Sequence, residues 1–482
     1  MNRKNLTYCN PISLPNYQQG PASIKKGKAR TEKSEIPHSD KWLHDVRRDF
    51  REMADPTVIK FKNRYYLFPS YSLIWYSDDL VNWHYQPVEP FARPGSLVAP
   101  TAVEKDGWLY LTACTDKMWR ARDPLGPWEF IGHVKDENGQ VFRLFDPMLF
   151  VDDDNRMYCY FSDGRNVYAV KMKDSDPTSF DGPKVRCFGY DPAHRWERFG
   201  DYNQDPDRSW IEGPWMTKHN GRYYLQYSAP GTEYKKYSLG CYVGDSPLGP
   251  FTYQERNPIL SEKGGLINGT GHHSVVEGPD GNLWCVYTIL VRIEYAFERR
   301  IAMDPVGFDE KGNMFVAGPT ETPQFAPGIS LKPWEDNDTG LVPLSINEYV
   351  CASSYAAGHE PVYAVDNYIR TWWEAADAST PQWLCVDLGR EYEVHAARTL
   401  FADRGLDYEA GILPGPYGYI IEGSADGKEW STLIDKSGNT LEQHIEYDTW
   451  DPRRVRYVRL VVLSAPAGIR VGVWEFTVFG RP

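Results

Sequence analysis

The sequence predicts an all-β protein of two domains, a five-bladed β-propeller followed by a β-sandwich. Two observations carry this prediction: a strand–turn–strand phrase that recurs through the first two thirds of the chain, and a change of pattern near residue 344. The length of 482 residues also suits two domains, one of roughly 300 residues and a smaller one, better than a single domain.

Each copy of the phrase opens on a head residue, continues as an apolar strand, and reaches a turn that is followed by an aromatic-rich strand. Four copies read ADPTVIKFKNRYYLF (54–68), FDPMLFVDDDNRMYCYF (145–161), IEGPWMTKHNGRYYLQY (211–227) and GHHSVVEGPDGNLWCVY (271–287). A degenerate copy, VAPTAVEKDGWLYL (98–111), has no titratable head. Five units with periods of roughly 40 to 65 residues and a hairpin in each are typical of a β-propeller.

The head residues keep their place in the unit. Asp146, Glu212 and His272 precede an aromatic residue of the second strand by the same number of positions, and Asp55 precedes one by a single position fewer. Because the first strand of every blade lines the central channel of a propeller, the heads converge on one end of the axis. The sequence therefore predicts that these four side chains share one pocket.

The composition limits the kinds of partner. A net charge of −13 and a pI near 5.4 argue against a nucleic-acid groove or an anionic membrane surface and favour a neutral partner. The 17 Trp and 32 Tyr residues fit recognition of sugars by flat apolar faces, although sheet cores rich in aromatic residues account for them equally well. No apolar run is long enough to span a membrane, and the N-terminus lacks the apolar core of a signal peptide. We expect an exported protein, periplasmic or extracellular, whose signal is absent from this chain.

The eight cysteines form no Cys-x-x-Cys spacing. Disulfides stay open but are not indicated. Cys114, Cys159 and Cys285 lie inside apolar strands, where we expect them to act as small buried hydrophobic residues.

The organisation along the chain follows from these patterns. Residues 1–45 are polar and contain a basic patch, which predicts an irregular arm that either wraps the propeller or forms a mobile tail. The propeller is expected over 46–325, a Pro/Gly/Asp-rich linker over 326–344, and the sandwich over 345–482. In the last region, runs such as WLCVDLG (383–389) and VRYVRLVVL (455–463) alternate in the manner of β-strands.

The predicted convergence of three carboxylates and an imidazole has a chemical implication. Like charges that lie together cost free energy unless some are protonated or paired. Hydrolysis of a glycosidic bond uses such a set, with one carboxylate ionised as the base and another kept protonated as the acid. A separation of about 6.5–9.5 Å leaves room for a water molecule and gives inversion, whereas about 5 Å gives retention. Each Asp alone could merely cap a turn, but the equal placement of three acidic heads favours a functional role.

The ordered motifs Ala-Asp-Pro (54–56), Phe-Asp-Pro (145–147), Ile-Glu-Gly-Pro (211–214) and Gly-Thr-Gly-His-His (269–273) resemble glycoside hydrolase family 43 over about residues 46–320. That resemblance implies an inverting glycosidase on a five-bladed propeller. By it, Asp55 is the general base, Glu212 is the general acid, and Asp146 orients the acid and raises its pKa. His272 matches a histidine that reaches a metal ion or water on the axis, a role that His273 could take instead.

Further substrate-binding residues are less sharply defined. Arg299 or Arg300 matches an arginine near the sugar in that family, and the sequence leaves open which of the two it is. Trp75, Trp119 and Trp215 are candidate sugar platforms, although such tryptophans more often belong to the core.

The C-terminal region resembles a second family. The segment ASSYAAGHEPVYAVDNYIRTWWEA (352–375), the later WLCVDLG and the terminal VWEFTVFG (473–480) resemble discoidin or coagulation factor 5/8 type C modules, also seen as family 32 carbohydrate-binding modules. The resemblance implies a jelly-roll sandwich with a structural calcium near Asp366, Thr371 and Glu475, whose hard oxygens suit that ion, unless these residues merely cap loops. Candidate sugar-binding aromatics of its loops are Tyr363, Tyr368 and Tyr417.

The expected function is that of an inverting, exo-acting glycosidase that removes α-L-arabinofuranosyl or β-D-xylosyl units from plant polysaccharides or oligosaccharides. Relatives that act on galactans often carry Glu at the base position, so Asp55 favours a pentose. No cofactor is required for the chemistry. The alternatives are an endo-arabinanase or a galactan-acting relative, and a propeller that has lost catalysis and only binds glycans. The oligomeric state is not predicted.

Overall fold

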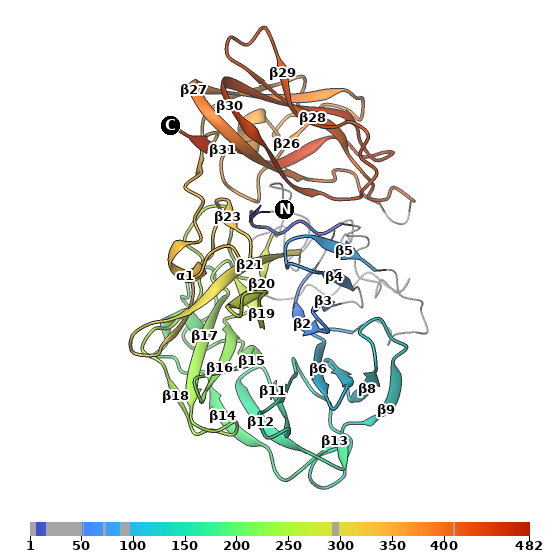
Figure 1. The fold of residues 1–482 in the computed structure, drawn as a ribbon, viewed down its shortest axis with the longest axis vertical. Helices are drawn as coiled ribbons and strands as arrows, with labels where there is room; N and C mark the ends of the chain where they lie inside the picture. The colour runs from blue at the N-terminus through green and yellow to red at the C-terminus, as the bar shows by residue number, and fades with distance from the viewer. Residues whose placement is uncertain are drawn as a thin grey trace.

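The computed structural model describes residues 6–15, 51, 53–70, 74–86, 97–291, 298–407 and 410–482. Almost all regular structure in these ranges is β-strand, arranged as five blades around an axis and, above them in Figure 1, a C-terminal β-sandwich. None of the helices in these ranges is long and apolar enough to cross a membrane. The predicted fold class is confirmed.

Each blade is an antiparallel sheet of strands that follow one another along the chain. The first contains β2 (Thr57–Phe61), β3 (Arg64–Phe68), β4 (Trp75–Ser77) and β5 (Trp83–Tyr85), and the second contains β6 (Thr101–Lys105), β7 (Trp108–Thr112), β8 (Lys117–Ala121) and β9 (Glu129–His133). The third contains β10 (Met148–Val151), β11 (Met157–Ser162), β12 (Asn166–Lys173), β13 (Asp176–Phe180) and β14 (Val185–Gly189). The fourth contains β15 (Glu212–His219), β16 (Arg222–Ala229), β17 (Ser238–Gly244) and β18 (Phe251–Tyr253), and the fifth contains β19 (Gly271–Glu277), β20 (Leu283–Leu290), β21 (Arg299–Phe308) and β22 (Met314–Val316).

Turn chemistry and apolar faces explain why these hairpins form a ring. The tight turns after β2, β6 and β15 place Asn63, Asp106 and Asn220 at φ values of 66°, 54° and 47°, a conformation that Asn and Asp adopt more readily than most residues. The first strands contact one another in the order β2, β6, β10, β15 and β19, and β19 returns to β2. Apolar clusters fill the space between neighbouring blades, such as the one that joins Leu67 of β3 to Trp284 of β20.

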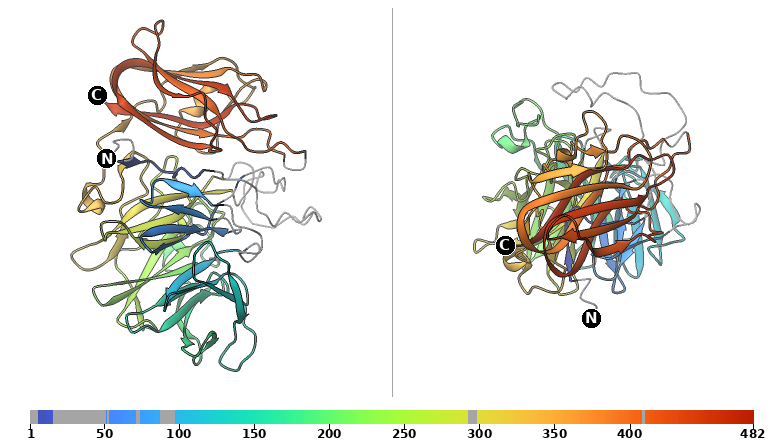
Figure 2. Two further views of the ribbon diagram at one scale, coloured as in Figure 1. Left: turned by 45° about the vertical axis from the view of Figure 1, so that its right-hand side comes forward. Right: turned by 90° about the horizontal axis from the view of Figure 1, so that it is seen from above.

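Part of the predicted N-terminal arm, residues 6–15, lies between the propeller and the C-terminal domain (Figure 2). Its strand β1 (Thr7–Tyr8) pairs with β23 (Gln324–Phe325). Asn10 exchanges two hydrogen bonds with the backbone of Met303 in β21, at 3.0 and 2.9 Å, and its carbonyl oxygen accepts one from Arg398 of the C-terminal domain at 2.6 Å. The rest of the predicted arm, 1–5 and 16–45, lies outside the described residues.

The C-terminal domain has the strand order β24-β31-β27-β30-β28-β29, with β25 beside β27 and β26 beside β31. These strands are β24 (Val342–Pro343), β25 (Tyr349–Ala352), β26 (Trp373–Glu374), β27 (Gln382–Phe401), β28 (Gly418–Ser424), β29 (Ser431–Lys436), β30 (Ile445–Ser464) and β31 (Gly472–Arg481). Their inward residues form one apolar core that includes Trp373, Leu384, Val458 and Phe476. The short helix α1 (Pro333–Asp336) and β24 lie in the region expected to be the linker.

The two domains share a buried interface. Its apolar cluster consists of Leu266 and Val291 of the propeller and Ile369, Leu400, Ala402, Ile445 and Trp474 of the C-terminal domain. Next to Ala402, the side chain of Arg51 forms buried ion pairs with Asp403, at 2.7 Å, and with Glu442. The C-terminal domain is therefore packed against the propeller through both apolar and charged residues.

Candidate active site

The head residues lie at the start of the first strand of their blades, in an unusual backbone conformation. Asp55, Asp146 and His272 have φ values of 54°, 47° and 37°, and Ala99, at the head of the second blade, has 47°. Such left-handed conformations are uncommon for residues other than glycine, and they cluster at functional sites. Four blades therefore repeat one local turn at the position that the sequence phrase marks.

The fourth blade departs from this pattern by one residue. There the left-handed residue is Gly213, with a φ of 53°, and Glu212 precedes it. A Cβ atom at Gly213 would lie 3.1 Å from Cγ of His272, so the close approach of the imidazole ring also favours glycine. The Gly213 N–H donates a hydrogen bond to the carboxylate of Asp146, which links Asp146 to the strand that carries Glu212.

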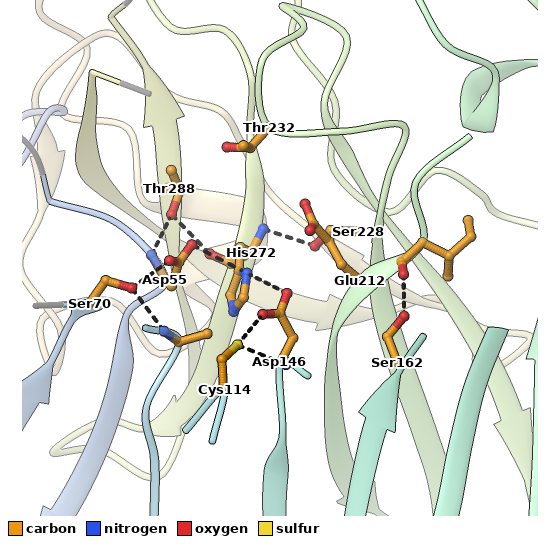
Figure 3. Close-up of polar contacts among 12 residues, drawn as sticks. Asp55, Ser70, Cys114, Asp146, Ser162, Glu212, Ser228, Thr232, His272 and Thr288 are labelled. Atoms are coloured by element: carbon orange, nitrogen blue, oxygen red, sulfur yellow. Dashed lines mark hydrogen bonds and ion pairs between the residues drawn. The ribbon is translucent and has the colours of Figure 1, made fainter. Parts of the chain in front are cut away.

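Asp55 is 5% exposed, and its carboxylate contacts three side chains, of which Figure 3 shows Ser70 and His272. Its Oδ1 lies 3.2 Å from Nη1 of Arg299 and 3.3 Å from Nδ1 of His272, and its Oδ2 accepts a 2.6 Å hydrogen bond from Ser70. Burial alone raises the pKa of this carboxyl group, but Arg299, His272 and Ser70 outweigh burial and hold the pKa below its ordinary value. Asp55 is therefore ionised at neutral pH.

Asp146 contacts the same imidazole nitrogen. Its Oδ2 is 3.5 Å from Nδ1 of His272, and its Oδ1 accepts a hydrogen bond from the thiol of Cys114 at 3.1 Å. Burial raises the pKa of Asp146, and the charge of Asp55 raises it further, against the opposing effect of His272. The imidazole is thus shared between the carboxylates of two blades.

Glu212 has a strongly perturbed ionisation. It is 8% exposed, and its Oε1 accepts a hydrogen bond from the hydroxyl of Tyr237 at 2.6 Å. Burial raises the pKa of Glu212 well above its ordinary value, and repulsion from Asp146 and Asp55 adds to the shift, while Tyr237 partly offsets it. The site therefore holds an ionised carboxylate and a protonated carboxyl group together, which is the arrangement that acid–base chemistry needs.

The structure distinguishes the two arginines that the sequence left open. Arg299 contacts Asp55 and also donates a hydrogen bond to Oγ1 of Thr232 at 3.2 Å. Arg300 points into the domain interface, where it is 1% exposed and its Nε donates to Nε2 of His444 at 2.8 Å. The expectation that Arg300 could bind the sugar is wrong, because the C-terminal domain covers it.

The predicted tryptophan platforms are mostly core residues. Trp75 is fully buried between blades and its Nε1 donates to the carbonyl oxygen of Pro15 at 2.7 Å, so the prediction that Trp75 binds sugar is wrong. Trp119 lies on β8, the third strand of its blade, and is partly buried against an apolar cluster. Trp215 follows closely after Glu212 on β15 and is 8% exposed, and its contact with a sugar stays a prediction.

The side chains around His272 do not fit a metal ion. Oδ1 of Asp55 and Oδ2 of Asp146 lie 3.3 and 3.5 Å from the same ring nitrogen, Nδ1. In the described part of the chain, no group of three or more His, Cys, Asp and Glu side chains has an arrangement that could hold a metal ion. His273 does not replace His272: it is buried, its Nε2 lies 3.4 Å from Oε1 of Gln226, and burial lowers its pKa to about 3.

Sequence reasoning missed the residues that hold the acidic heads. Ser70, Cys114 and Tyr237 each donate a hydrogen bond to one of them, so the prediction that Cys114 is only a buried hydrophobic residue is wrong. Burial and the neighbouring Asp146 raise the pKa of the Cys114 thiol, which keeps it protonated as a donor. The sequence contains a pattern that could have identified Ser70 and Cys114. Each comes just after the second strand of its blade, and Ser70 follows Asp55 by the same number of positions as Cys114 follows Ala99.

The residues predicted to hold calcium in the C-terminal domain lie close together. Oδ2 of Asp366 accepts a hydrogen bond from Thr371 at 2.7 Å, and Oε2 of Glu475 accepts one from the Asn367 N–H at 3.0 Å. Burial raises the pKa of Glu475 to about 8, with a further contribution from repulsion by Asp366. Oδ1 of Asn367 is buried without a hydrogen-bond partner among the described residues. Two carboxylates that repel each other beside an unsatisfied amide oxygen fit a hard cation.

The loop aromatics predicted to bind sugar in the same domain differ in exposure. Tyr417 is fully buried and its hydroxyl donates to Asp403 at 2.7 Å, so its predicted role is wrong. Tyr363 is half-buried and Tyr368 is 45% exposed. Only these two of the three are accessible to a ligand.

Comparison with known proteins bears on both domains. The sequence model of glycosyl hydrolases family 43 matches residues 51–314, which is more than half of the chain. The protein belongs to glycosyl hydrolase family 43. A second model, that of the F5/8 type C domain, matches residues 349–476 of this hydrolase. The resemblance to both families, and the expectation of an enzyme that hydrolyses O-glycosyl bonds, are confirmed.

Relatives of this family 43 hydrolase act on several sugars. A β-D-galactofuranosidase of Aspergillus niger is 27% identical over 296 residues, which cover 54% of the chain and 81% of the relative. A xylosidase/arabinosidase of Humicola insolens is 27% identical over 291 residues, which cover 46% of the chain and 84% of the relative. A solved structure described as a glycoside hydrolase is 22% identical, covers 89% of the chain and 97% of its own, and has a TM-score of 0.49. Membership of the family makes the substrate of this hydrolase a glycan.

Proposed function

We propose that this family 43 hydrolase is an exo-acting, inverting glycosidase that removes α-L-arabinofuranosyl or β-D-xylosyl units from plant-type polysaccharides or oligosaccharides. The observation that carries the proposal is the opposite ionisation of two heads, since the pKa of Asp55 is held low and the pKa of Glu212 is raised well above its ordinary value. Hydrolysis with acid–base catalysis requires one group that accepts a proton and one that donates it.

Asp55 is the general base in this mechanism, and Glu212 is the general acid. The ionised carboxylate of Asp55 takes a proton from a water molecule as the water oxygen bonds to the anomeric carbon. Glu212 gives its proton to the glycosidic oxygen as the bond between that oxygen and the anomeric carbon breaks. Asp55 ends protonated and Glu212 ends ionised, and exchange with solvent restores both. Attack from the face opposite the leaving group inverts the anomeric configuration.

Asp146 is a positioning residue for the acid. The hydrogen bond from Gly213 ties its carboxylate to the strand of Glu212, and its charge contributes to the raised pKa of Glu212. Arg299 and His272 keep Asp55 ionised, and their contacts with Asp55 support a role for both in binding the sugar.

The choice of sugar draws on the relatives and on the base. The Humicola relative is named a xylosidase/arabinosidase, and an aspartate at the base position favours a pentose by the family resemblance. A β-D-galactofuranoside is the second candidate, because the Aspergillus relative acts on that sugar. An endo-arabinanase is a third. A propeller that only binds glycans is disfavoured, because it has no need of heads with opposite protonation.

Export to the periplasm or the cell exterior is part of the proposal. A polysaccharide substrate is met outside the cytoplasm, and family 43 membership fits such a substrate. Fractionation of cells that express the natural gene, with detection of the protein by antibody, tests this location.

The decisive experiment is hydrolysis by the wild type and by Glu212→Gln. Substrates are the 4-nitrophenyl α-L-arabinofuranoside, β-D-xyloside and β-D-galactofuranoside, with arabinoxylan oligosaccharides and linear arabinan. Glu212→Gln is expected to lose at least about 10²-fold in kcat on the natural glycans, whose leaving groups need a proton. Glu233→Gln, which removes a neighbouring carboxyl group, is the matched control.

Release of single sugars from linear arabinan supports exo action, and release of oligosaccharides contradicts it.

The stereochemistry provides a separate test. Proton NMR of a reaction in progress identifies the first-formed anomer, which is expected to have the configuration opposite to that of the substrate. Retention, or a wild-type rate of Glu212→Gln on arabinoxylan oligosaccharides, would contradict the assigned roles.

A calcium ion in the C-terminal domain is proposed as a structural element. Asp366, Thr371 and Glu475 would hold it, together with the amide oxygen of Asn367. The ion would relieve the repulsion between the two carboxylates and take no part in hydrolysis.

A further inference from the structure

Five side chains, one from each blade, link neighbouring blades at the level of the heads (Figure 3). Four of them accept a hydrogen bond from the backbone N–H of the head in the next blade. These bonds are Ala99 N–H to Ser70 at 2.9 Å, Asp146 N–H to Cys114 at 3.2 Å, His272 N–H to Ser228 at 2.8 Å and Asp55 N–H to Thr288 at 3.0 Å. In the remaining blade, Ser162 donates to the carbonyl oxygen of Ile211, next to Glu212. Because the fifth blade returns to the first, we call these five residues the inter-blade ring.

The strand ladders explain why every blade has such a residue at this level. The separation along the chain between Ser70 and its head, Asp55, differs by a single position from that between Thr288 and its own head, His272. Within their blades, the backbone N–H groups of Ser70, Cys114 and Ser162 donate to the carbonyl oxygen of the residue before the head, at 3.0, 2.9 and 3.0 Å. The hairpin register therefore places each ring residue opposite the head of its own blade. The side chain of the ring residue then forms its hydrogen bond with the backbone of the next blade.

Two members of the ring also reach carboxylates of the candidate active site. The Ser70 oxygen accepts the N–H of Ala99, so its single proton is directed at Oδ2 of Asp55, 2.6 Å away. The Cys114 sulfur accepts the N–H of Asp146 and donates its proton to Oδ1 of the same residue at 3.1 Å. Each carboxylate is thus held by a side chain that is itself fixed by the backbone of a neighbouring blade.

We infer that Ser70 and Cys114 are positioning residues that fix the rotamers of the base Asp55 and of Asp146, and that the inter-blade ring thereby holds together a site assembled from separate blades. The inference rests on the proposed function for the roles of the two carboxylates. Its physical basis is that displacement of a catalytic group by about 1 Å costs on the order of 10²-fold in rate, so the hydrogen bonds that fix a side chain matter as much as its identity.

The ring itself indicates which substitutions its positions accept. Thr288 shows that threonine fits, and three serines show that a hydroxyl fits where Cys114 has a thiol. We therefore compare Ser70→Ala with Ser70→Thr, and Cys114→Ala with Cys114→Ser. The control is Ser77→Ala, because Ser77 is also a buried serine of the first blade. Its hydroxyl donates a hydrogen bond to the carboxylate of Asp79 at 3.0 Å and accepts one from the backbone N–H of Leu80 at 2.9 Å. Neither partner is a head residue.

Steady-state hydrolysis of the best aryl glycoside of the panel is measured for each variant, with Tm as the measure of stability. Ser70→Ala is expected to lower kcat by about 10- to 100-fold with KM within about threefold of wild type, because the base is misplaced while the sugar still binds. Ser70→Thr is expected to restore kcat to within about fivefold, and Cys114→Ser to exceed Cys114→Ala by a similar margin. Ser77→Ala is expected to lower Tm with kcat near that of the wild type.

Equal kcat values for Ser70→Ala and Ser77→Ala, or a Ser70→Thr variant no faster than Ser70→Ala, would overturn the inference. A readout without turnover separates it from the proposed function. In crystal structures, the Asp55 side chain is expected to leave its wild-type rotamer in Ser70→Ala and to keep it in Ser77→Ala and Ser70→Thr. A wild type that hydrolyses no substrate of the panel refutes the proposed function, and an unmoved Asp55 in Ser70→Ala refutes the ring inference.

Discussion

Nε of Arg300 in the propeller donates a hydrogen bond to Nε2 of His444 in the F5/8 type C domain, at 2.8 Å. Burial lowers the pKa of His444 well below its ordinary value, and the positive charges of Arg51 and Arg300 lower it further, so the imidazole is neutral and can accept this bond. The adjacent residue in β21 is Arg299, which contacts Asp55 at 3.2 Å. One strand therefore carries both a contact to the base and a contact to the second domain.

This relationship predicts different effects for two neighbouring substitutions. Arg300→Lys removes the Nε donor to His444 and is expected to lower the free energy of unfolding by about 1.5–3 kcal/mol, the range for a buried charged hydrogen bond, with little change in kcat. Arg299→Lys is expected to lower kcat more than about tenfold with a smaller loss of stability, because the contact to Asp55 is weakened. Denaturant unfolding and steady-state kinetics on both variants check the pair, and the reverse ranking would contradict it.

Removal of residues 345–482 is expected to prevent folding of a soluble propeller. The cut exposes Leu266 and Val291, which are fully buried against the C-terminal domain, and leaves the side chain of Arg51 without Asp403 and Glu442. Size-exclusion chromatography and circular dichroism of the truncated chain measure the outcome. A monomeric truncated propeller with wild-type kcat would show that the domains are independent.

The alkaline limb of the pH–rate profile should depend on Tyr237. Activity requires protonated Glu212 and is lost as the pH rises through the pKa of that group. Tyr237 donates a hydrogen bond to Glu212 and lowers its pKa, so Tyr237→Phe should raise the pKa and move the alkaline limb to higher pH. The control is Tyr287→Phe, because Tyr287 donates a similar 2.6 Å bond to Asp304 in the propeller interior. A limb that stays in place or moves to lower pH in Tyr237→Phe would argue against Glu212 as the acid.

Calcium should stabilise the protein more at alkaline than at acidic pH. The pKa of Glu475 is raised to about 8, so below that pH its carboxyl group is protonated in the folded protein and a cation must displace the proton. The rise in Tm on adding calcium chloride to protein treated with a chelator should therefore be larger at pH 8.5 than at pH 6. Glu475→Gln should abolish the difference between the two pH values. A calcium effect that is equal at both pH values in the wild type would contradict the proposed site.

The convergence of Asp55, Asp146 and His272 could be predicted from sequence, because the repeated phrase reports strand register and register fixes where the heads lie. Their contacts could not be predicted. Neighbouring residues on a strand point to opposite faces, so one of Arg299 and Arg300 had to face away from the site, but only the packing of the second domain shows which.

The errors at Trp75 and Cys114 share one physical cause. Both residues lie in or beside apolar strands, and residue type and strand pattern do not report what an adjacent blade places against them. Trp75 meets the backbone of the N-terminal segment, at Pro15, whereas Cys114 meets a carboxylate of the next blade. Contacts between segments distant in sequence decide such cases, and the local pattern is the same for both outcomes.

The position of residues 6–15 has a consequence for biosynthesis. The partners of Asn10 include Met303 and Arg398, which follow it by 293 and 388 positions. The ribosome must therefore translate the chain beyond Arg398 before Asn10 can reach its final environment. The N-terminal segment is accordingly expected to dock in a late step of assembly, which depends on some of the longest-range pairings among the described residues.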